Sequence, residues 1–385
     1  MHEAVIVDAV RTPLGKRNGS LSDWHPADLA AETLKSVAER NSLDPTLVDD
    51  VIMGCVSQVG EQTYNIGRNA VLGAGWPETV PGVTIDRQCG SSQQSVHFAA
   101  QGVMAGAYDV VVAAGVESMT RVPMGSSMVD GMPFGERMRE RYHNNLIPQG
   151  LSAELIADKW GIGRTELDQI GADSQRRALR ATEEGRFDTQ VVPIEVKRDG
   201  VVEILTRDEG IRPGTSVETL GALRPAFKED GVVTAGNSSQ ITDGASAVLI
   251  MSSAKAKELG LNPKARFVSF SLAGTDPVSM LTGPIPATEK ALAKAGLTHA
   301  DIDLYEVNEA FAAVIGAWLR ETGADWDKVN VNGGAIALGH PLGASGARLM
   351  TTLVHELERT GGRYGLQTMC EGGGLANGTI IESLA

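Results

Sequence analysis

Two cysteines stand out among the residues that could do chemistry, and the first is Cys89. It lies in QCGSSQQS, directly after the apolar-alternating VTID, among small and amide residues rather than the aliphatic neighbours of a core thiol. The pattern SQQSVHFAAQGVMAG predicts a helix that begins here, and a helix N-terminus lowers the pKa of a thiol toward thiolate. Cys89 is therefore either a nucleophile open to a substrate or an inert core thiol, and local composition alone favours the second.

Three further polar residues follow in the C-terminal part of the chain. His340, in ALGHPLGASGAR, is either an accessible base or a surface turn histidine. Cys370, in TMCEGGG, precedes three glycines and is either an acid/base beside an oxyanion hole or buried packing. Asn308, in EVNEAF, is either a site residue or the N-cap of a helix over NEAFAAVIGAWL. Cys55, in VIMGCVSQ, has no such setting and is assigned to the core.

A duplicated pattern of strands and helices would position these residues. EAVIVDAV, the helical ADLAAETLKSVAERN and VIMGCV are repeated by ARFVSFSLAG, ATEKALAKAGL and LYEVNEA, with cap-like boxes at Thr46 and Thr298. VTIDRQCGSS is matched by VNVNGGAIALGHPLG, and DVVVAAGVES by GLQTMCEGGG. We predict a duplicated βαβαβ unit with mainly parallel sheets covered by helices. Equivalent bends of the two halves should then face each other and pair Cys89 with His340.

A different segment, residues 119–242, separates the two copies. It contains an Arg-rich helical pattern, TELDQIGADSQRRALRATEEG, followed by the loop-like GIRPGTSVETLGALRPAF. Of the 34 Lys and Arg residues, 16 lie between positions 119 and 243. This positive charge indicates either solvated helix faces or a lid that meets a phosphorylated ligand. We expect an N-terminal half of residues 1–118 plus 243–265, the inserted domain 119–242, and a C-terminal half of residues 266–385.

Composition excludes several classes of protein. The net charge of −14 argues against a general binder of nucleic acid or anionic membranes. The three cysteines form no CxxC pair or Cys/His cluster, so we expect no metal site and a reducing compartment. The N-terminal MHEAVIVDAV lacks the pattern of a signal peptide, and no apolar run is long enough for a membrane span. We expect a cytoplasmic protein.

Taken together, the motifs resemble those of the thiolase family, the acetyl-CoA acyltransferases and 3-ketoacyl-CoA thiolases, over essentially the whole chain. The matching segments are QCGSSQQS, TAGNSSQITDGASAV, VNEAFA, NVNGGAIALGHPLGASGAR and CEGGG. The resemblance implies the thiolase-like five-layered αβαβα fold, with two duplicated halves and an inserted loop domain. It also implies a homodimer or homotetramer that uses coenzyme A as co-substrate. No prosthetic group, metal, nucleic acid or membrane partner is expected.

The resemblance assigns roles to five residues of the reaction centre. Cys89 matches the nucleophile that becomes acylated, and His340 matches the histidine that activates this thiol and helps to stabilise the enolate oxygen. Cys370 matches the acid/base that exchanges a proton with the acetyl-CoA α-carbon. Asn308 matches the asparagine that holds the water of one oxyanion hole. The N–H of Gly372 is expected to join that of Cys89 in the second.

The coenzyme A residues are also carried over by resemblance. Ser239 matches a serine that touches the pantetheine, while Arg212, Phe227 and Ala235 fall at positions that line the path of the nucleotide. The Arg-rich insertion fits this assignment, because coenzyme A carries several phosphate charges.

The same resemblance indicates which class of acyl-CoA substrate to expect. Biosynthetic acetoacetyl-CoA thiolases have a His-Met pair where this chain has Pro148 and Gln149, and QCGSSQQ is more similar to bacterial thiolases that degrade long or bulky chains, including steroid side chains. Met280 remains where the acetoacetyl enzymes have a methionine. We expect a degradative 3-ketoacyl-CoA thiolase, with an acetoacetyl-CoA thiolase as the alternative. A β-ketoacyl synthase is disfavoured because it would lack Cys370, and a non-catalytic acyl-CoA or sterol binder is the candidate from another class.

Overall fold

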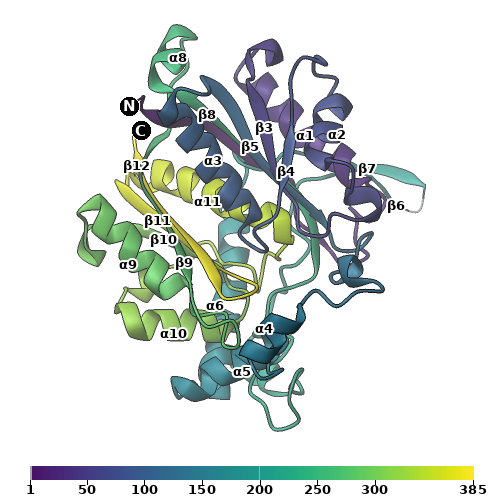
Figure 1. Cartoon of the computed structure of the whole chain (residues 1–385), viewed down its shortest axis with the longest axis vertical. Helices are drawn as coiled ribbons and strands as arrows, with labels where there is room; N and C mark the ends of the chain where they lie inside the picture. The colour runs from purple at the N-terminus through teal and green to yellow at the C-terminus, as the bar shows by residue number, and fades with distance from the viewer. Residues whose placement is uncertain (1, 199) are drawn as a thin grey trace.

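The computed structural model describes residues 2–198 and 200–385 and has a mixed α/β architecture built on one ten-stranded sheet (Figure 1). The strand order is β10-β11-β12-β9-β1-β8-β5-β3-β4, and β2 pairs with β8. The N-terminal strands are β1 (Ala4–Arg11), β2 (Gly15–Lys16), β3 (Asp50–Gly54), β4 (Val83–Ile85), β5 (Val110–Ser118) and β8 (Thr242–Ser252). The C-terminal strands are β9 (Ala265–Gly274), β10 (Leu304–Val307), β11 (Tyr364–Glu371) and β12 (Leu375–Ser383).

The strand order confirms the predicted duplication. The sequence β3-β5-β8-β1 in one half corresponds to β10-β11-β12-β9 in the other, and the two halves meet where β1 pairs with β9. The expectation of mainly parallel sheets is wrong: among the strands of the described residues, only β3–β4, β3–β5 and β10–β11 pair in parallel. The antiparallel pairs have a local cause. The short Gly372–Gly374 turn leads from β11 directly into β12, so these two strands must pair antiparallel. In the N-terminal half, β8 occupies the position of β12 and pairs antiparallel with β5.

Helices complete the five layers that were predicted. α3 (Ser91–Ala105) and α11 (Ser345–Thr360) pack on each other between the two halves of the sheet (Figure 1). α1 (Pro26–Arg40) and α2 (Ile66–Gly73) cover the outside of the N-terminal half, while α9 (Pro284–Ala295) and α10 (Ala312–Thr322) cover the C-terminal half. The central layer is tight: a Cβ added at Gly346 would overlap the backbone of Gln93.

The segment between the halves combines helices and one hairpin with long irregular stretches. It contains α4 (Glu136–Arg141), α5 (Gln149–Lys159), α6 (Arg164–Glu183), the hairpin of β6 (Ile194–Arg198) and β7 (Val201–Leu205), and the short α7 (Val217–Gly221). The Arg-rich pattern correctly predicted α6, whereas the stretch expected to be a loop includes α7. Both α5 and α6 pack on α10, beside the C-terminal ends of the strands that carry Asn308 and Cys370 (Figure 1). α8 (Ser253–Glu258) follows β8.

Several local predictions can be compared directly. Thr298 forms the expected capping box, but the first cap is made by the side chain of Asp44 rather than by Thr46. VNVN is not a strand. The amide of Asn330, whose φ is 46°, donates to the carbonyl of Val307 and accepts from its N–H, both at 2.8 Å, and so replaces the backbone pairing of a strand.

Candidate active site

Cys89 lies at the start of α3, where the preceding backbone is strained. Gln88 has a φ of 48°, a left-handed conformation that is unusual for a residue with a side chain. The Cys89 side chain is 5% exposed and packs with Met119, Leu342 and Met369. Leu342 is only two residues beyond His340, so the bends of the two halves meet as the duplication predicted.

The pKa of Cys89 does not fall as its helical position predicted. Burial raises the pKa of this thiol to about 12, and a negative charge on Glu371 or Glu117 would act in the same direction. The backbone N–H groups of Gly372 and of Cys89 itself face the thiol and lower its pKa, but burial outweighs them. Cys89 is therefore a neutral thiol at rest, and it needs a base to become a nucleophile.

Cys370 lies close enough to Cys89 for the two thiols to interact electrostatically. It is the penultimate residue of β11, and its side chain is 1% exposed. Burial raises the pKa of Cys370 well above its ordinary value, and a negative charge on Cys89 or Glu371 would raise it further. The structure thus brings together Cys89, Cys370 and the N–H of Gly372, three groups that the sequence assigned to one centre.

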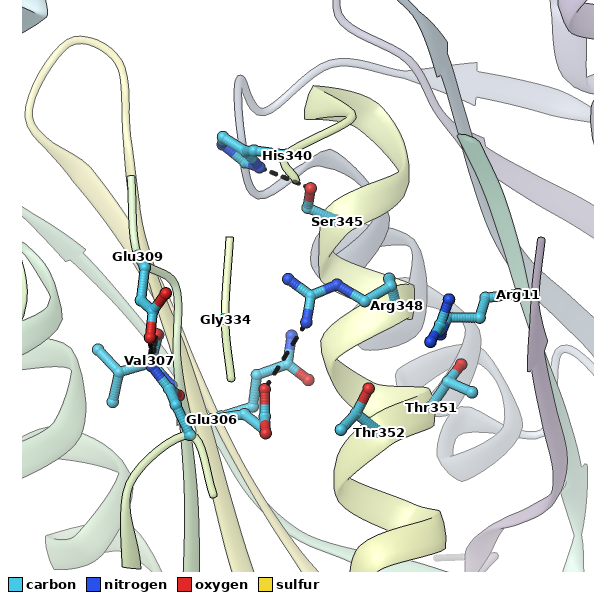
Figure 2. Close-up of polar contacts among 12 residues, drawn as sticks. Arg11, Glu306, Val307, Glu309, Gly334, His340, Ser345, Arg348, Thr351 and Thr352 are labelled. Atoms are coloured by element: carbon cyan, nitrogen blue, oxygen red, sulfur yellow. Dashed lines mark hydrogen bonds and ion pairs between the residues drawn. The ribbon is translucent and has the colours of Figure 1, made fainter. Parts of the chain in front are cut away.

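His340 is fixed by hydrogen bonds from its backbone N–H and from its ring Nδ1. Its backbone N–H donates to the hydroxyl of Thr242 at 3.1 Å, and Gly339 before it has a φ of 111°. Its Nδ1 lies 2.6 Å from the hydroxyl of Ser345 (Figure 2), and that hydroxyl donates to the carbonyl of Pro341 at 2.8 Å. Because the Ser345 hydrogen is used, the hydroxyl accepts from Nδ1–H, and Nε2 is the unprotonated nitrogen with the lone pair.

Asn308 faces that lone pair. Its Nδ2 lies 3.4 Å from His340 Nε2, and its backbone N–H donates to the carbonyl of Thr368 on β11, two residues before Cys370. Asn308 Oδ1 is buried without a partner among the described residues, so it can accept a hydrogen bond from water. The competing interpretation of Asn308 as a helix N-cap is wrong, since α10 begins at Ala312 after Phe311.

A buried arginine lies one turn beyond Ser345 on α11. Arg348 is 1% exposed, and its Nη1 lies 3.8 Å from Oε2 of Glu306 (Figure 2). Burial lowers the pKa of His340 to about 3, and the positive charge of Arg348 acts in the same direction. The imidazole is consequently neutral at physiological pH, which leaves Nε2 able to accept a proton.

Two buried carboxylates brace the loops of the site, and neither was identified from the sequence. Glu117 accepts hydrogen bonds from the N–H groups of Val56, Ser57 and Gly343, and so ties the loop after β3 to the loop of His340. Glu309 accepts from Ser174 at 2.6 Å and from the N–H of Ile336 at 3.1 Å, among other contacts. An acidic residue at the end of an apolar strand was the available signal in both cases.

The amides that follow Cys89 have a structural role. Gln93 donates to the hydroxyl of Thr379 at 2.8 Å and to the carbonyl of Gln367 at 3.3 Å. Gln94, 3% exposed, accepts from the amide of Asn377 at 3.2 Å. Much of the polarity of QCGSSQQS therefore serves a buried network between α3 and the C-terminal strands.

The residues expected to line the coenzyme A path lie on the inserted segment and beside the Asn308 loop. Arg212 borders a cavity of about 400 Å³ between α6 and residues 212–218. The rings of Phe227 and Phe311 pack edge to face, with their centroids 5.9 Å apart. The N–H of Ser239 donates to the carbonyl of Ala310 at 2.9 Å. Ala235 is exposed.

One amide connects this path to the reaction centre. The side chain of Gln240 accepts from Nη2 of Arg212 at 3.5 Å, while its backbone carbonyl accepts from the N–H of His340 at 3.3 Å. A ligand that moves Arg212 would therefore act on a residue that also holds His340.

Two residues that the resemblance linked to the acyl pocket border the centre. Nε2 of Gln149, at the start of α5, lies 3.4 Å from the point where a Cβ of Gly372 would be. Met280 is 8% exposed and belongs to the same apolar cluster as Cys370. Within the described residues there is no group of His, Cys, Asp and Glu that could hold a metal ion, and no helix there is long and apolar enough to cross a membrane.

Comparisons with known proteins identify the family of the chain. The chain matches the family models described as "Thiolase, N-terminal domain" over residues 4–254 and "Thiolase, C-terminal domain" over residues 261–383. It is 51% identical over 392 residues to the steroid 3-ketoacyl-CoA thiolase FadA6 of Mycobacterium tuberculosis, which covers 100% of this chain and 95% of that protein. It is 44% identical over 393 residues to the 3-ketoacyl-CoA thiolase of Bacillus subtilis, with 99% and 100% covered.

A solved structure shows the same fold. The crystal structure of the Bacillus anthracis acetyl-CoA acetyltransferase superposes with a TM-score of 0.92 at 41% identity, over 100% of this chain and 99% of that one. Two family models that together span nearly the whole sequence, and full-length relatives at this identity, establish that the chain belongs to the thiolase family.

Proposed function

We propose that this thiolase cleaves 3-ketoacyl-CoA with a second molecule of coenzyme A, giving acetyl-CoA and a shortened acyl-CoA. The observation that carries the proposal is the meeting of two thiols, Cys89 and Cys370, with a neutral imidazole whose free Nε2 faces Asn308. A nucleophile, a base and a separate acid are the three groups that this reaction requires.

The first half-reaction begins with proton transfer from Cys89 to His340 Nε2. The thiolate then attacks the 3-keto carbon, and the resulting oxyanion accepts from the N–H groups of Cys89 and Gly372, both of which face the thiol. The bond between the α-carbon and the former keto carbon breaks next. Its electron pair forms the enolate of acetyl-CoA, and the acyl group stays on Cys89 as a thioester.

The enolate is stabilised and then protonated. Its oxygen accepts hydrogen bonds from the protonated His340 and from a water held by Asn308, and Cys370 donates a proton to its α-carbon. Acetyl-CoA leaves and a second coenzyme A enters. Its thiol gives its proton to the Cys370 thiolate and attacks the acyl thioester, and the expelled Cys89 thiolate recovers its proton from His340, so the kinetics are ping-pong. Coenzyme A is a co-substrate throughout, and no prosthetic group takes part in these steps.

The inserted segment is proposed to cover coenzyme A. We keep the boundaries 1–118 plus 243–265, 119–242 and 266–385 for the two halves and the loop domain. Arg212, at the cavity beside α6, supplies a positive charge for the nucleotide phosphates, and Phe227 and Ala235 line the same path. Ser239 meets the pantetheine, since its backbone is bonded to the loop that carries Asn308.

The acyl group is proposed to be long or bulky, with a steroid side chain as one candidate. Gln149 at the mouth of the site and the similarity to a steroid 3-ketoacyl-CoA thiolase support this substrate class. Met280, in the cluster of Cys370, and the likeness to an acetyl-CoA acetyltransferase favour the second candidate, an acetoacetyl-CoA thiolase. A protein that binds acyl-CoA without turnover is disfavoured, because Cys89, His340, Cys370 and Asn308 are all present.

A thiolysis series tests the substrate class. Initial rates would be measured with acetoacetyl-CoA, medium-chain and long-chain 3-ketoacyl-CoAs and a steroid side-chain 3-ketoacyl-CoA. We expect kcat/KM to be higher for long or steroid substrates than for acetoacetyl-CoA, and the reverse order would establish the second candidate. We further propose a cytoplasmic homodimer or homotetramer, and light scattering of the purified chain would give its mass.

A further inference from the structure

A buried carboxyl group lies beside both thiols and takes no part in the steps above. Glu371 follows Cys370 at the end of β11, and its side chain is 0% exposed. Neither of its carboxyl oxygens has a hydrogen-bond partner among the described residues. An ionised carboxylate without donors is strongly disfavoured in a protein interior, so the state of this group needs an explanation.

The Glu371 carboxyl reaches the start of α3. A Cβ added at Gly90 would overlap Glu371 Oε1, and it would lie 2.6 Å from Oδ1 of Asn377 on β12. Both oxygens therefore lie against the backbone of the residue that follows Cys89. The glycine at position 90 leaves the space that they occupy.

The hydrogen bonds of Asn377 determine which of its atoms faces Glu371. Its Nδ2 lies 3.2 Å from Oε1 of Gln94 and 3.4 Å from Nδ1 of His97, so both amide hydrogens are used. Burial lowers the pKa of His97 to about 3, and the ring is neutral. Asn377 Oδ1 and both Glu371 oxygens have no donor among the described residues, and Asn377 Oδ1 and Glu371 Oε1 both lie within 2.6 Å of the Cβ position of Gly90. Two neighbouring hydrogen-bond acceptors without donors repel each other, and a proton on one of them converts the repulsion into a hydrogen bond.

The charged groups that act on Glu371 lie in the loop before α3. Burial raises the pKa of Glu371 well above its ordinary value, Arg87 acts against this, and Asp86 reinforces it. Arg87 Nε is itself buried without a partner among the described residues, so no ion pair with Glu371 is formed. In turn, a negative charge on Glu371 would raise the pKa of both Cys89 and Cys370.

We propose that Glu371 is a neutral carboxylic acid that donates its proton to Asn377 Oδ1 and thereby acts as a positioning residue for the two thiols. The O–H bond links the end of β11 to β12 against the start of α3, and so holds the elements that carry Cys370 and Cys89. It also keeps negative charge away from the thiol that must become a thiolate. This role deepens the proposed thiolase function and rests on it.

The proposal has a defined pH dependence. The native state holds the Glu371 proton more tightly than the unfolded chain, so its contribution to stability is complete in acid and decreases as pH rises. Once Glu371 ionises, its charge opposes the deprotonation of Cys89. The alkylation rate of Cys89 should therefore rise less steeply with pH than the rate of a single thiol would.

The test compares wild type with Glu371→Gln, whose amide is neutral, similar in shape and able to donate to Asn377. Arg87→Gln is the matched control. Alkylation of Cys89 by iodoacetamide would be followed by mass spectrometry of its peptide between roughly pH 6 and 10, where cysteine thiols ionise. No substrate is needed, so an error in the proposed function would not affect the result.

We expect Glu371→Gln to react within about twofold of wild type near neutral pH and to follow a single titration at higher pH. The infrared difference between the two proteins should contain the C=O band of a protonated carboxyl group. A loss of more than about tenfold in both Glu371→Gln and Arg87→Gln would overturn the proposal, because it would identify an ion pair between these residues. Absence of the infrared band, or failure of Glu371→Gln to fold, would also overturn it.

Discussion

The hydroxyl of Ser345 offers the sharpest test of how the base is prepared. Ser345→Ala removes the acceptor that lies 2.6 Å from Nδ1 of His340 and leaves that buried N–H without a partner. An unsatisfied buried donor costs about 1–3 kcal/mol. The imidazole can escape this cost by moving its proton to Nε2, provided that the Asn308 amide, whose Nδ2 faces Nε2, turns and presents its unpartnered Oδ1 instead. In that tautomer His340 cannot take the proton of Cys89.

The same free energy sets the size of the effect. A cost of about 1–3 kcal/mol corresponds to a loss of about 5- to 150-fold in kcat/KM for the acylation of Cys89. The matched control is Ser246→Ala. The Ser246 hydroxyl, on β8, donates to the carbonyl of Ala344 at 2.7 Å, directly before Ser345, and has no hydrogen bond to His340. Stopped-flow acylation and thermal unfolding would be measured for both variants. If Ser345→Ala keeps the wild-type rate, or if Ser246→Ala loses as much, the tautomer argument is refuted.

Three other outcomes are expected. Cys370→Ala should abolish cleavage and condensation while an acyl-CoA still acylates Cys89; unchanged thiolysis would exclude the acid/base role. Neutralising Arg212 should raise the KM for coenzyme A more than it lowers kcat, and an unaltered KM would remove Arg212 from the coenzyme A path. Urea midpoints should fall as pH drops below about 6.5, because the pKa of His97 and of His340 is lowered to about 3 and the unfolded chain then binds more protons. A His97→Asn variant with the same acid dependence would contradict this.

The duplication explains why much of the centre could be predicted from the sequence. Matching bends in two related halves placed Cys89 opposite the loop of His340, and the packing of Cys89 on Leu342 agrees with that placement. The cap at Thr298 and the Arg-rich helix α6 depend on local patterns and were predicted correctly. These features need only short-range information or a repeat that is visible in the sequence.

Other features depend on contacts between distant segments, and sequence patterns do not contain them. The pKa of Cys89 follows from burial by many residues, which outweighs the helix terminus that predicted the opposite shift. The antiparallel return of β12 is set by the Gly372–Gly374 turn and by its pairing with β9. Glu371 and Asn377 lie six positions apart, yet their relation becomes evident only when β11, β12 and Gly90 are brought together.

The central claim is that Cys89 carries the acyl group between two half-reactions. The most direct measurement mixes the enzyme with a 3-ketoacyl-CoA, isolates the protein, and determines the mass of the Cys89 peptide before and after addition of coenzyme A. The account predicts release of acetyl-CoA with an acyl group on Cys89, followed by its transfer to the added coenzyme A. An acyl group on another residue, or one that coenzyme A does not remove from Cys89, would contradict it.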